Sequence, residues 1–318
     1  MAEITIIIPM YNAEKTLRKC LDSVKAQNYK NYGVILIDDC STDNSAQVTQ
    51  EYGYKIIKLN QRSGQGKARN IGAQQALTKY LAFTDSDCIL PKDWLSKIMA
   101  DFKNRKAEFI CDGYSGSVGN TFLEKYAFYE LLIRRKNLSN PITSFPSNNF
   151  ACNREIFIKE KGFSEQKNYV AEDLEFSLEV GRKYKIFWDK NLGIKHHFHK
   201  GLKKYIKQQY RFARDTIYLY LRKPNLKKIK TYQEEKNKFV IFYTAILELN
   251  IVLSFFYSTI VYLIPFLLII ILLLDFSLIN YISKKEGIIS SVKSMFVIIL
   301  RNMSWTTGMI SGIIRFFV

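Results

Sequence analysis

The stretch YLAFTDSDC, residues 80–88, is an apolar run that ends in two aspartates one position apart. Side chains alternate along an extended backbone, so Asp85 and Asp87 are expected to point the same way at the end of a buried strand. Mg2+ and Mn2+ accept one or two carboxylates together with phosphate oxygens of a substrate. The stretch therefore predicts a strand end that holds a divalent cation against a diphosphate. The alternative is a chance acidic pair on a solvated turn.

Short runs rich in β-branched and aromatic residues alternate with helix-like stretches through residues 4–111. This alternation predicts an α/β fold with a mainly parallel sheet. Ligands of such sheets gather at the carboxyl ends of the strands, where polar residues stand at 9–12, 38–39 and 85–87. We therefore expect one cleft formed by three strand ends. The expected strands are 4–8, 33–37, 55–59, 79–83 and 108–111, and the expected helices are 14–27, 43–52, 64–77 and 92–103.

Six segments resemble, in order and spacing, motifs of the family 2 glycosyltransferases. These enzymes have the GT-A fold, a Rossmann-like fold that binds nucleotide-diphospho-sugars, and the resemblance covers roughly residues 3–215. It implies a catalytic domain over residues 1–199 and an inverting transfer of a sugar from a UDP- or GDP-sugar with Mg2+ or Mn2+. The segments are 8–12 (IPMYN), 37–43 (IDDCSTD), 64–72 (GQGKARNIG), 84–88 (TDSDC), 171–173 (AED) and 208–212 (QQYRF).

The resemblance implies that the donor nucleotide lies over the ends of the first strands. Asp38 resembles the carboxylate that accepts a hydrogen bond from the base or ribose, although Asp38 and Asp39 could instead cap the following helix. Lys67 opens a helix after two glycines, where cations and free N–H groups can face phosphate; a solvated helix start is the alternative. The residues expected at the donor are Pro9, Tyr11, Glu14, Asp38, Asp39, Lys67, Arg69, Asn70, Asp85 and Ser86.

Asp87 is the expected metal ligand, and Asp85 is expected to share in contacts with the nucleotide or with metal-bound water. A late histidine completes the metal site in many GT-A enzymes, and all three histidines of this chain lie at 196–199. The resemblance favours His197 for this place. His196 and His199 remain alternatives, because neighbouring imidazoles can be ordinary surface residues.

Glu172 and Asp173 precede an apolar, helically spaced stretch, which places them in the first turn of a helix, where the macrodipole favours ionised carboxylates. The Asp of this pair is the general base in the resembling family. Asp173 is therefore expected to take the proton of an attacking hydroxyl, with Glu172 in support; an ordinary acidic helix start is the alternative. The pair favours a hydroxyl acceptor, such as one on a lipid-linked saccharide, over a polyprenyl phosphate, whose anionic oxygen needs no base.

Gln208 and Arg211 lie one helical turn apart and match the Gln-x-x-Arg-Trp element of the family, so Arg211 is expected to reach the donor phosphate or the acceptor. Phe212 stands in place of the Trp. It keeps a stacking surface but lacks the indole donor, which favours a non-processive enzyme over a polysaccharide synthase. Asn148 and Asn149 lie in a segment similar to the acceptor-side loop of the family, although its composition is equally typical of a turn.

Residues 239–274 contain one charged residue, Glu248, and exceed the ~20 residues that cross a ~30 Å hydrocarbon layer. Extended to residue 281, the segment predicts a transmembrane hairpin of two helices in the cell membrane. Basic residues at both ends place the catalytic domain in the cytoplasm. A buried hairpin in a soluble core is the alternative. Residues 282–318 are expected to form an interfacial, re-entrant or third membrane segment.

Residues 200–238 hold 13 Lys or Arg against three acidic residues, within a net charge of +18 for the chain. Helical spacing of apolar residues here predicts a basic amphipathic helix on a membrane with anionic lipids, at ~1 kcal/mol per cation. This position beside the predicted hairpin disfavours nucleic acid as the partner of the basic face.

Other protein classes are disfavoured by what the chain contains. The first strand begins at residue 4 with no signal peptide before it, and the five cysteines show no paired spacing, so we expect reduced thiols in the cytoplasm. An inactive, membrane-tethered nucleotide-sugar binder should lack the aspartate pair or the base, and both are present. A nucleotidyltransferase needs a glycine-rich loop after the first strand, where Pro9 and Met10 stand instead.

Overall fold

The computed structural model describes residues 2–227 and 235–318, and the chain folds as two compact units. Unit 1 comprises Met1–Val118 and Asn137–His197, and unit 2 comprises Gly119–Lys136 and Phe198–Val318. The catalytic domain expected over 1–199 therefore differs from unit 1 mainly at residues 119–136, and also at 198–199. The longer segment belongs to unit 2 because its helix buries Leu123, Tyr126 and Ala127 in the apolar cluster of that unit.

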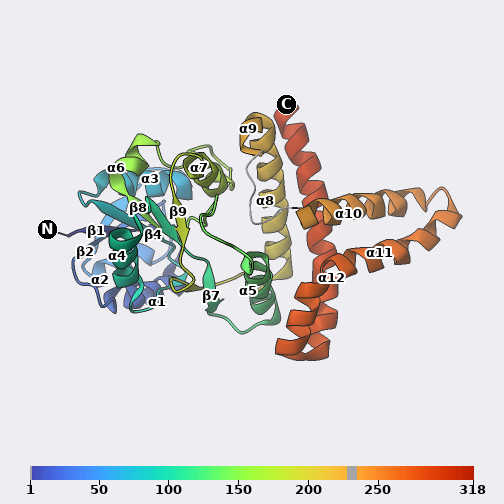
Figure 1. Cartoon of the computed structure of the whole chain (residues 1–318), viewed down its shortest axis with the longest axis horizontal. Helices are drawn as coiled ribbons and strands as arrows, with labels where there is room; N and C mark the ends of the chain where they lie inside the picture. Colours follow the sequence, from blue (N-terminus) through green and yellow to red (C-terminus); the bar gives the residue numbers. More distant parts are fainter. Residues whose placement is uncertain (1, 228–234) are drawn as a thin grey trace. The chain divides into compact units, whose positions relative to one another are not determined.

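A seven-stranded sheet forms the centre of unit 1, with strand order β3-β2-β1-β4-β8-β6-β9 (Figure 1). Neighbouring strands are parallel except where β8 pairs with β4 and β6, so the expected mainly parallel α/β sheet is confirmed. Each of the five expected strands is present. The strands are β1 (Ile4–Met10), β2 (Tyr32–Asp38), β3 (Lys55–Lys58), β4 (Tyr80–Thr84), β6 (Phe109–Cys111), β8 (Asn149–Asn153) and β9 (Ile186–Trp188).

Apolar residues cover both faces of this sheet. All seven residues of β1 are buried, which is why this strand reads as a continuous apolar run rather than an alternating one. One face is covered by α1, α2 and α4, and the other by α3, α6 and α7, where Phe83 stacks on Phe150 with ring centroids 4.4 Å apart. These helices are α1 (Glu14–Lys25), α2 (Ser45–Glu51), α3 (Gln65–Gln75), α4 (Trp94–Arg105), α6 (Arg154–Lys159) and α7 (Glu172–Gly181).

Helix α3 lies unusually close to the sheet. A Cβ atom on Gly72 would come within 2.6 Å of side-chain atoms of both Ile7 and Ile37, so this position has no room for a larger residue. The close packing fixes the start of α3 beside the carboxyl ends of β1 and β2. A second, three-stranded sheet in unit 1 has the order β5-β10-β7, from Cys88–Ile89, Ile194–His196 and Tyr114–Ser117.

Unit 2 is helical and is built along its last helix. The 42-residue α12 (Phe276–Phe317) is kinked at Gly287, whose φ of 83° lies in the left-handed region. Beyond the kink, a Cβ atom on Gly308 or Gly312 would collide with the carbonyl oxygen of Tyr210 or Arg214 in α8. The two glycines thus allow α8 and α12 to pack backbone to backbone. The other helices are α5 (Phe122–Arg135), α8 (Leu202–Arg222), α9 (Pro224–Lys227), α10 (Glu235–Leu253), η1 (Ser258–Tyr262) and α11 (Leu263–Leu274).

Helix α8 is the amphipathic helix expected within residues 200–238, and residues 228–234 of that expected region lie outside the described residues. Its buried side includes Tyr205, Gln209 and Leu219 and packs inside unit 2. The apolar stripe expected to lie against lipid is therefore occupied in part by α12. The sequence signal is the same in both cases, because a helix partner and a membrane both favour a one-sided apolar face.

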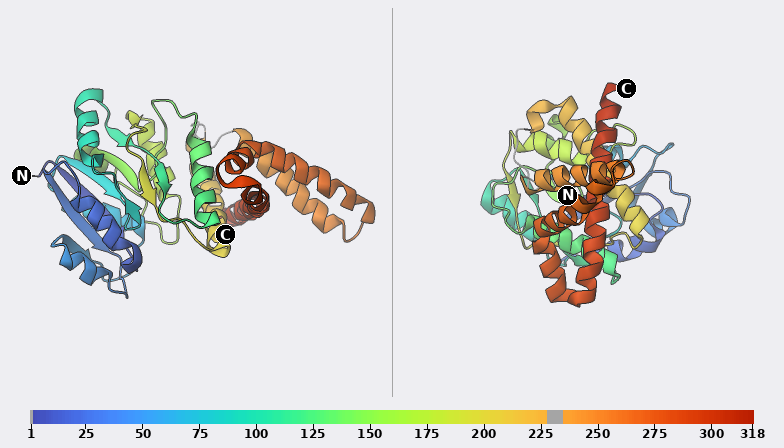
Figure 2. Two further views of the ribbon diagram at one scale, coloured as in Figure 1. Left: turned by 90° about the horizontal axis from the view of Figure 1, so that it is seen from below. Right: turned by 90° about the vertical axis from the view of Figure 1, so that its right-hand side faces the viewer.

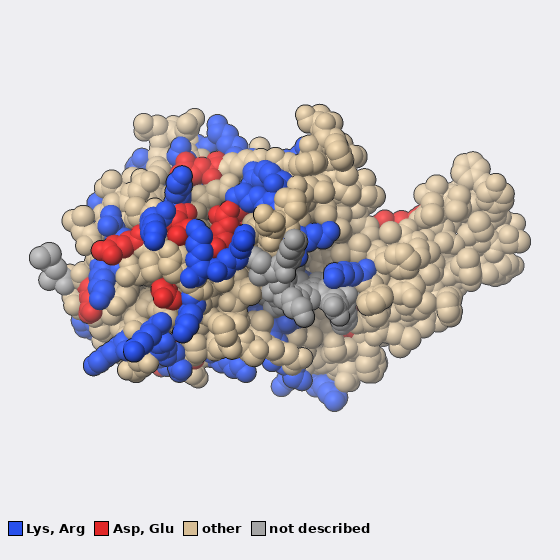
Figure 3. Space-filling view, turned by 45° about the horizontal axis from the view of Figure 1, so that its top comes forward, with Lys and Arg blue, Asp and Glu red and all other residues tan. Residues whose placement is uncertain are grey.

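Helices α10 and α11 lie side by side as a hairpin with an almost uncharged surface (Figures 2 and 3). Phe255, Phe256 and Tyr262 near its tip are 77–83% exposed. The second helix of the expected pair ends at Leu274 rather than at residue 281. The kink at Gly287 divides α12 into two helical parts, and the second part lies within the segment expected over 282–318. Among the described residues, α12 is the one helix long and apolar enough to cross a bilayer, and half of its most apolar 18-residue window is buried in the protein.

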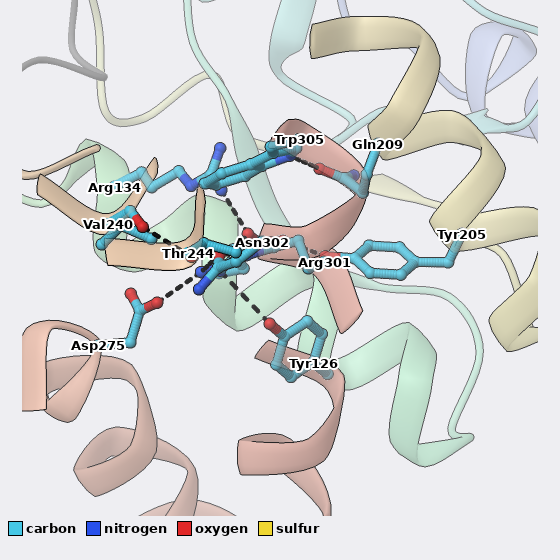
Figure 4. Close-up of polar contacts among 11 residues, drawn as sticks. Tyr126, Arg134, Tyr205, Gln209, Val240, Thr244, Asp275, Arg301, Asn302 and Trp305 are labelled. Atoms are coloured by element: carbon cyan, nitrogen blue, oxygen red, sulfur yellow. Dashed lines mark hydrogen bonds and ion pairs between the residues drawn. The ribbon is translucent and has the colours of Figure 1, made fainter. Parts of the chain in front are cut away.

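A buried polar network joins three helices of unit 2 (Figure 4). Arg301 of α12 is 2% exposed and donates to Glu130 of α5 (Nη1–Oε1, 2.7 Å) and to Asp275 (Nη2–Oδ2, 2.5 Å). Tyr205 of α8 donates its hydroxyl to the other oxygen of Glu130 (2.7 Å). The charges are therefore compensated inside the unit, where a lone buried cation would be strongly destabilising.

Replacing Arg301 with Met is expected to lower the free energy of unfolding by about 3–5 kcal/mol, because Asp275 loses its cation and Glu130 loses one partner. Thermal unfolding of the detergent-solubilised protein measures this loss. Lys285→Gln, at an exposed lysine of the same helix, is the matched control. An Arg301→Met protein as stable as the control would show that the network contributes nothing.

Candidate active site

Asp87 and His196 face each other at the end of the small sheet. Strand β10 pairs antiparallel with β5 so that His196 lies opposite Cys88, and the His196 Nε2 atom is 3.4 Å from Asp87 Oδ1. Burial opposes ionisation of Asp87, but the charge and hydrogen bond of His196 outweigh it and hold the pKa of Asp87 below its usual value. Asp87 therefore stays an ionised carboxylate.

The side chains around Asp87 offer ligand atoms that suit a hard divalent cation. Asp87, Cys88 and His196 each present one ligand atom, and these atoms lie within 4.8 Å of one another. Burial raises the pKa of the Cys88 thiol well above its usual value, so it remains a thiol and a poor ligand. A carboxylate oxygen and an imidazole nitrogen are left, and Mn2+ accepts both while Mg2+ prefers the oxygen.

His196, and not the expected His197, is the histidine whose ring lies beside Asp87. His197 instead donates its backbone N–H to the Asp87 carbonyl oxygen (3.0 Å). Neighbouring side chains on a strand point to opposite faces, so only one of two adjacent histidines can turn its ring to the carboxylate. The extent of β10 would have identified the right residue, but this three-residue strand has no recognisable sequence pattern.

A fully buried arginine joins the aspartate motif to the acidic pair. Arg69 Nη2 donates to Asp85 Oδ1 at 2.6 Å, and its Nη1 lies 3.8 Å from Glu172 Oε1. Burial lowers the pKa of Arg69, but the charges of Asp85, Glu172 and Asp173 and the hydrogen bond to Asp85 together raise it, so the guanidinium stays protonated. Arg69 was expected to face the donor phosphate; it is buried and paired with the two carboxylates, and its expected role at the donor stays a prediction.

The two carboxylates at the start of α7 are held with raised pKa values. Burial and the neighbouring Asp173 raise the pKa of Glu172 to about 8, against the opposing charge of Arg69. Burial also raises the pKa of Asp173, although backbone N–H groups of Leu174 and Ser147 donate to it. Glu172 therefore carries a proton at neutral pH, and Asp173 is the member of the pair that can accept one.

Asn148 and Asn149, in the segment similar to the acceptor-side loop of the family, have different partners. Asn149 is buried, with its amide oxygen accepting from Trp94 Nε1 (2.9 Å) and its nitrogen donating to backbone carbonyls. Asn148 instead donates to the hydroxyl of Tyr114 (3.0 Å), whose ring centroid lies 5.2 Å from that of His196. Asn148 and Tyr114 thus belong to the surroundings of the Asp87 site, and Tyr114 had no sequence signal.

Two of the residues expected to bind the nucleotide-sugar donor form hydrogen bonds with the backbone of nearby loops. The Asp39 carboxylate accepts from the backbone N–H of Ser63 (2.6 Å) and of Gly64 (2.9 Å), which fixes the turn before α3. The Asn70 amide donates to the Phe163 carbonyl (2.8 Å) and accepts from its N–H (2.9 Å). Asp39 and Asn70 therefore hold loops in place, and their expected contacts with the donor stay predictions.

The remaining donor candidates lie at the same edge of unit 1. Asp38 accepts from Ser41 N–H (2.8 Å) in the turn after β2; α2 begins only at Ser45, with Asn44 as its N-cap residue, so Asp38 does not cap that helix. Tyr11 is 38% exposed, and the guanidinium of Arg62 lies 3.5 Å from its ring centroid, a contact that no sequence pattern indicated. Other candidates are placed as follows: Glu14 accepts from Asn44 (2.9 Å), Lys67 pairs with Glu165 (3.7 Å), Pro9 is buried in β1, and Ser86 is partly exposed in the turn after β4.

Gln208 and Arg211 lie on α8 of unit 2. Arg211 is exposed and Gln208 is partly exposed, while the neighbouring Gln209 is buried and accepts from Trp305 Nε1 (3.0 Å). Their expected roles toward donor and acceptor stay predictions.

Residues 5–161 match the model of the family described as Glycosyl transferase family 2. The glycosyltransferase GlyA of Streptococcus pneumoniae is 34% identical over 116 residues, which cover 35% of this chain and 17% of that protein. The poly(ribitol-phosphate) beta-N-acetylglucosaminyltransferase TarS of Staphylococcus aureus is 34% identical over 107 residues, 31% of this chain and 19% of that protein. The chain spans only 17–46% of the length of the first three curated relatives it matches.

Solved structures show the same fold. The structure of TarS in complex with UDP-GlcNAc has a TM-score of 0.51 and 20% identity, covering 68% of this chain and 66% of that chain. A mannosyltransferase from Pyrobaculum calidifontis, in complex with GDP-Man and Mn2+, has a TM-score of 0.58 and 15% identity, covering 99% of this chain and 87% of that chain. By the match over residues 5–161 and by its GT-A fold, the chain belongs to the family 2 glycosyltransferases.

Proposed function

We propose that the chain transfers a sugar, with inversion and in the presence of Mg2+ or Mn2+, from a UDP- or GDP-sugar to a hydroxyl of a membrane-presented glycan. The observation that carries this proposal is Arg69, which contacts both Asp85 and Glu172. The guanidinium of Arg69 thus links the aspartate motif to the acidic pair. A donor diphosphate bound at the first and an acceptor hydroxyl bound at the second would lie close enough to react.

The donor side of the reaction would use Asp87 and His196 as metal ligands. A divalent cation bound there neutralises the charge that develops on the leaving diphosphate. Arg69 donates a hydrogen bond to Asp85, and Asp38 and Tyr11 lie at the carboxyl end of β1 and β2, where the nucleotide is expected. The complexes of the two structural neighbours, one with UDP-GlcNAc and one with GDP-Man and Mn2+, support a nucleotide-sugar donor and a divalent cation.

Asp173 would act as the general base on the acceptor side. Its raised pKa makes the carboxylate a stronger base, and the protonated Glu172 beside it does not compete for the proton. A base is required for a hydroxyl and not for a phosphate acceptor, which favours the hydroxyl. The name of TarS, an N-acetylglucosaminyltransferase for poly(ribitol-phosphate), supports a polyhydroxylated polymer as the acceptor class.

The membrane placement is part of this proposal. The largely apolar hairpin of α10 and α11 and the apolar α12 would hold the enzyme in the cell membrane with unit 1 in the cytoplasm. An acceptor carried on a lipid would then share the same surface, and Phe212 in place of Trp favours non-processive transfer.

Release of UDP or GDP tests the proposal. Full-length protein in detergent is incubated with a panel of UDP- and GDP-sugars with Mn2+, with Mg2+ or with EDTA. Metal-dependent release from one donor, increased by a glycan acceptor, is the expected result. Binding of a nucleotide sugar without release, in the presence of membrane extracts that supply acceptors, would instead support an inactive binder.

A further inference from the structure

A groove of about 550 Å3 opens on unit 2 between the first turn of α5, the start of α8 and the middle of α12. Its walls are mainly apolar and include Phe122, Leu202, Phe296 and Val297. Two lysines, Lys200 and Lys293, also line it. The volume lies in the range of small-molecule sites.

The apolar wall continues beyond the groove along α12. Ile288, Val292 and Phe296 follow one another at intervals of four residues, so they share one face of the helix. They are 58–69% exposed, although the side chains are large and apolar. This face offers a strip on which a hydrocarbon chain could lie, leading into the groove.

The charge of the groove is positive and uncompensated. Lys200 and Lys293 are exposed, and neither forms an ion pair with any residue in the described part of the chain. The acidic groups nearby already have partners: Glu286 accepts from Lys125 (2.7 Å) and Tyr129 (2.6 Å), and Glu124 accepts from the Thr121 hydroxyl (2.6 Å) at the cap of α5. Two free ammonium groups beside an apolar wall complement a ligand with an anionic head and an apolar tail.

We propose that this groove binds one anionic phospholipid of the bilayer, with its phosphate between Lys200 and Lys293 and a chain along the apolar strip of α12. The inference rests on the membrane placement in the proposed function, but not on its catalytic step. It adds a defined lipid site to the general attraction of a basic surface, and it makes the lipid a partner of unit 2.

The test is a lipid titration of the full-length protein in a nonionic detergent, read by native mass spectrometry and by thermal shift. Dioleoyl phosphatidylglycerol is expected to bind and to raise the melting temperature, and phosphatidylcholine is not. The double variant Lys200→Gln, Lys293→Gln is expected to bind phosphatidylglycerol roughly twentyfold more weakly, about fivefold for each lysine. All four side chains exchanged in this test and its control are exposed, so folding is not at risk.

The matched control is Lys203→Gln, Lys204→Gln, which removes the same charge from α8 outside the groove. If both double variants weaken phosphatidylglycerol binding equally, the lipid is attracted by surface charge alone and the proposal is overturned. Displacement of the lipid by millimolar inorganic phosphate would also overturn it, because the site would then recognise a free anion. Phe296→Ser is expected to reduce the preference for dioleoyl over dihexanoyl chains, and an unchanged preference would remove the strip of α12 from the site.

Release of UDP or GDP, measured on the same samples in detergent, keeps the two proposals separate. A wild-type protein that releases nucleotide but does not bind phosphatidylglycerol would overturn the lipid site alone. Specific lipid binding in a protein that releases no nucleotide would leave the lipid site standing and count against the proposed transfer.

Discussion

Asp173→Asn is expected to lower the turnover of sugar transfer by about 10²–10⁴-fold, the range that general acid–base catalysis supplies. The amide keeps the shape of the side chain and its place at the start of α7, but it cannot accept a proton at neutral pH. Binding of the nucleotide sugar should change little, because Asp85 and Asp87 have their own partners in Arg69 and His196.

Glu172→Gln is the matched control for this variant. Glu172 has a pKa of about 8, so at neutral pH it is mostly a neutral acid, which a glutamine resembles in shape and charge. Most of the activity should therefore remain. A ranking in the opposite order, with Glu172→Gln inactive and Asp173→Asn active, would give the base role to Glu172. Activity retained in both would point to an acceptor that is already an anion, such as a lipid phosphate.

The same pair predicts how the protein responds to pH. The raised pKa of Asp173 places the acid limb of kcat/KM above the usual aspartate value of 3.8, and activity should fall as pH drops through that limb. Glu172 titrates near 4.5 in the unfolded chain and near 8 in the fold, so folding takes up a proton between these values. The free energy of unfolding should therefore decrease as pH rises from about 4.5 to about 8, and Glu172→Gln should remove this decrease.

The sheet of unit 1 was predictable because burial on both faces leaves a strong mark on sequence. The runs at β1 and β4 are apolar apart from Thr5 and Thr84, and the expected site residues Tyr11 and Asp85 follow them directly. The alternation of side chains along a strand, however, did not extend to Asp85 and Asp87. Asp85 and Asp87 lie in the turn between β4 and β5, where alternation no longer applies, and their carboxylates have different partners, Arg69 and His196.

Partners that depend on tertiary contacts were not predictable. A lysine or arginine near a glycine-rich turn suggests phosphate binding, and nothing in residues 64–72 indicates that Arg69 is buried while Lys67 remains at the surface. The buried polar network around Arg301 illustrates the same limit, because its acidic partners Glu130 and Asp275 come from segments that are distant in sequence. The amphipathic pattern of α8 was recognised, but such a pattern does not show whether another helix or a membrane covers the apolar face.

Asp87→Asn is expected to abolish measurable metal-dependent release of nucleotide and to weaken binding of Mn2+ strongly. The substitution removes the ionised carboxylate while the amide keeps nearly the same shape. Burial lowers the pKa of its partner His196, but the charge and hydrogen bond of Asp87 and the charge of Asp85 together raise it, so loss of Asp87 should also leave this imidazole neutral at lower pH. Mn2+ affinity, measured by electron paramagnetic resonance with and without UDP, gives a readout that does not depend on turnover.

Asp93→Asn is the matched control. This aspartate is half-exposed before α4 and, within the described part of the chain, its carboxylate pairs with Lys97 one turn away and with no other cation, a contact worth little in water. The two adjacent histidines then separate the ligand from its neighbour. His196→Gln should weaken Mn2+ binding, since its ring faces Asp87, whereas His197→Gln should leave binding nearly unchanged, since His197 contributes a backbone N–H. The reverse order would restore His197 as the ligand and require β10 to turn its other face to the cation. Equal Mn2+ affinity in wild type and Asp87→Asn would place the cation elsewhere and leave the donor diphosphate to the cationic side chains of the cleft.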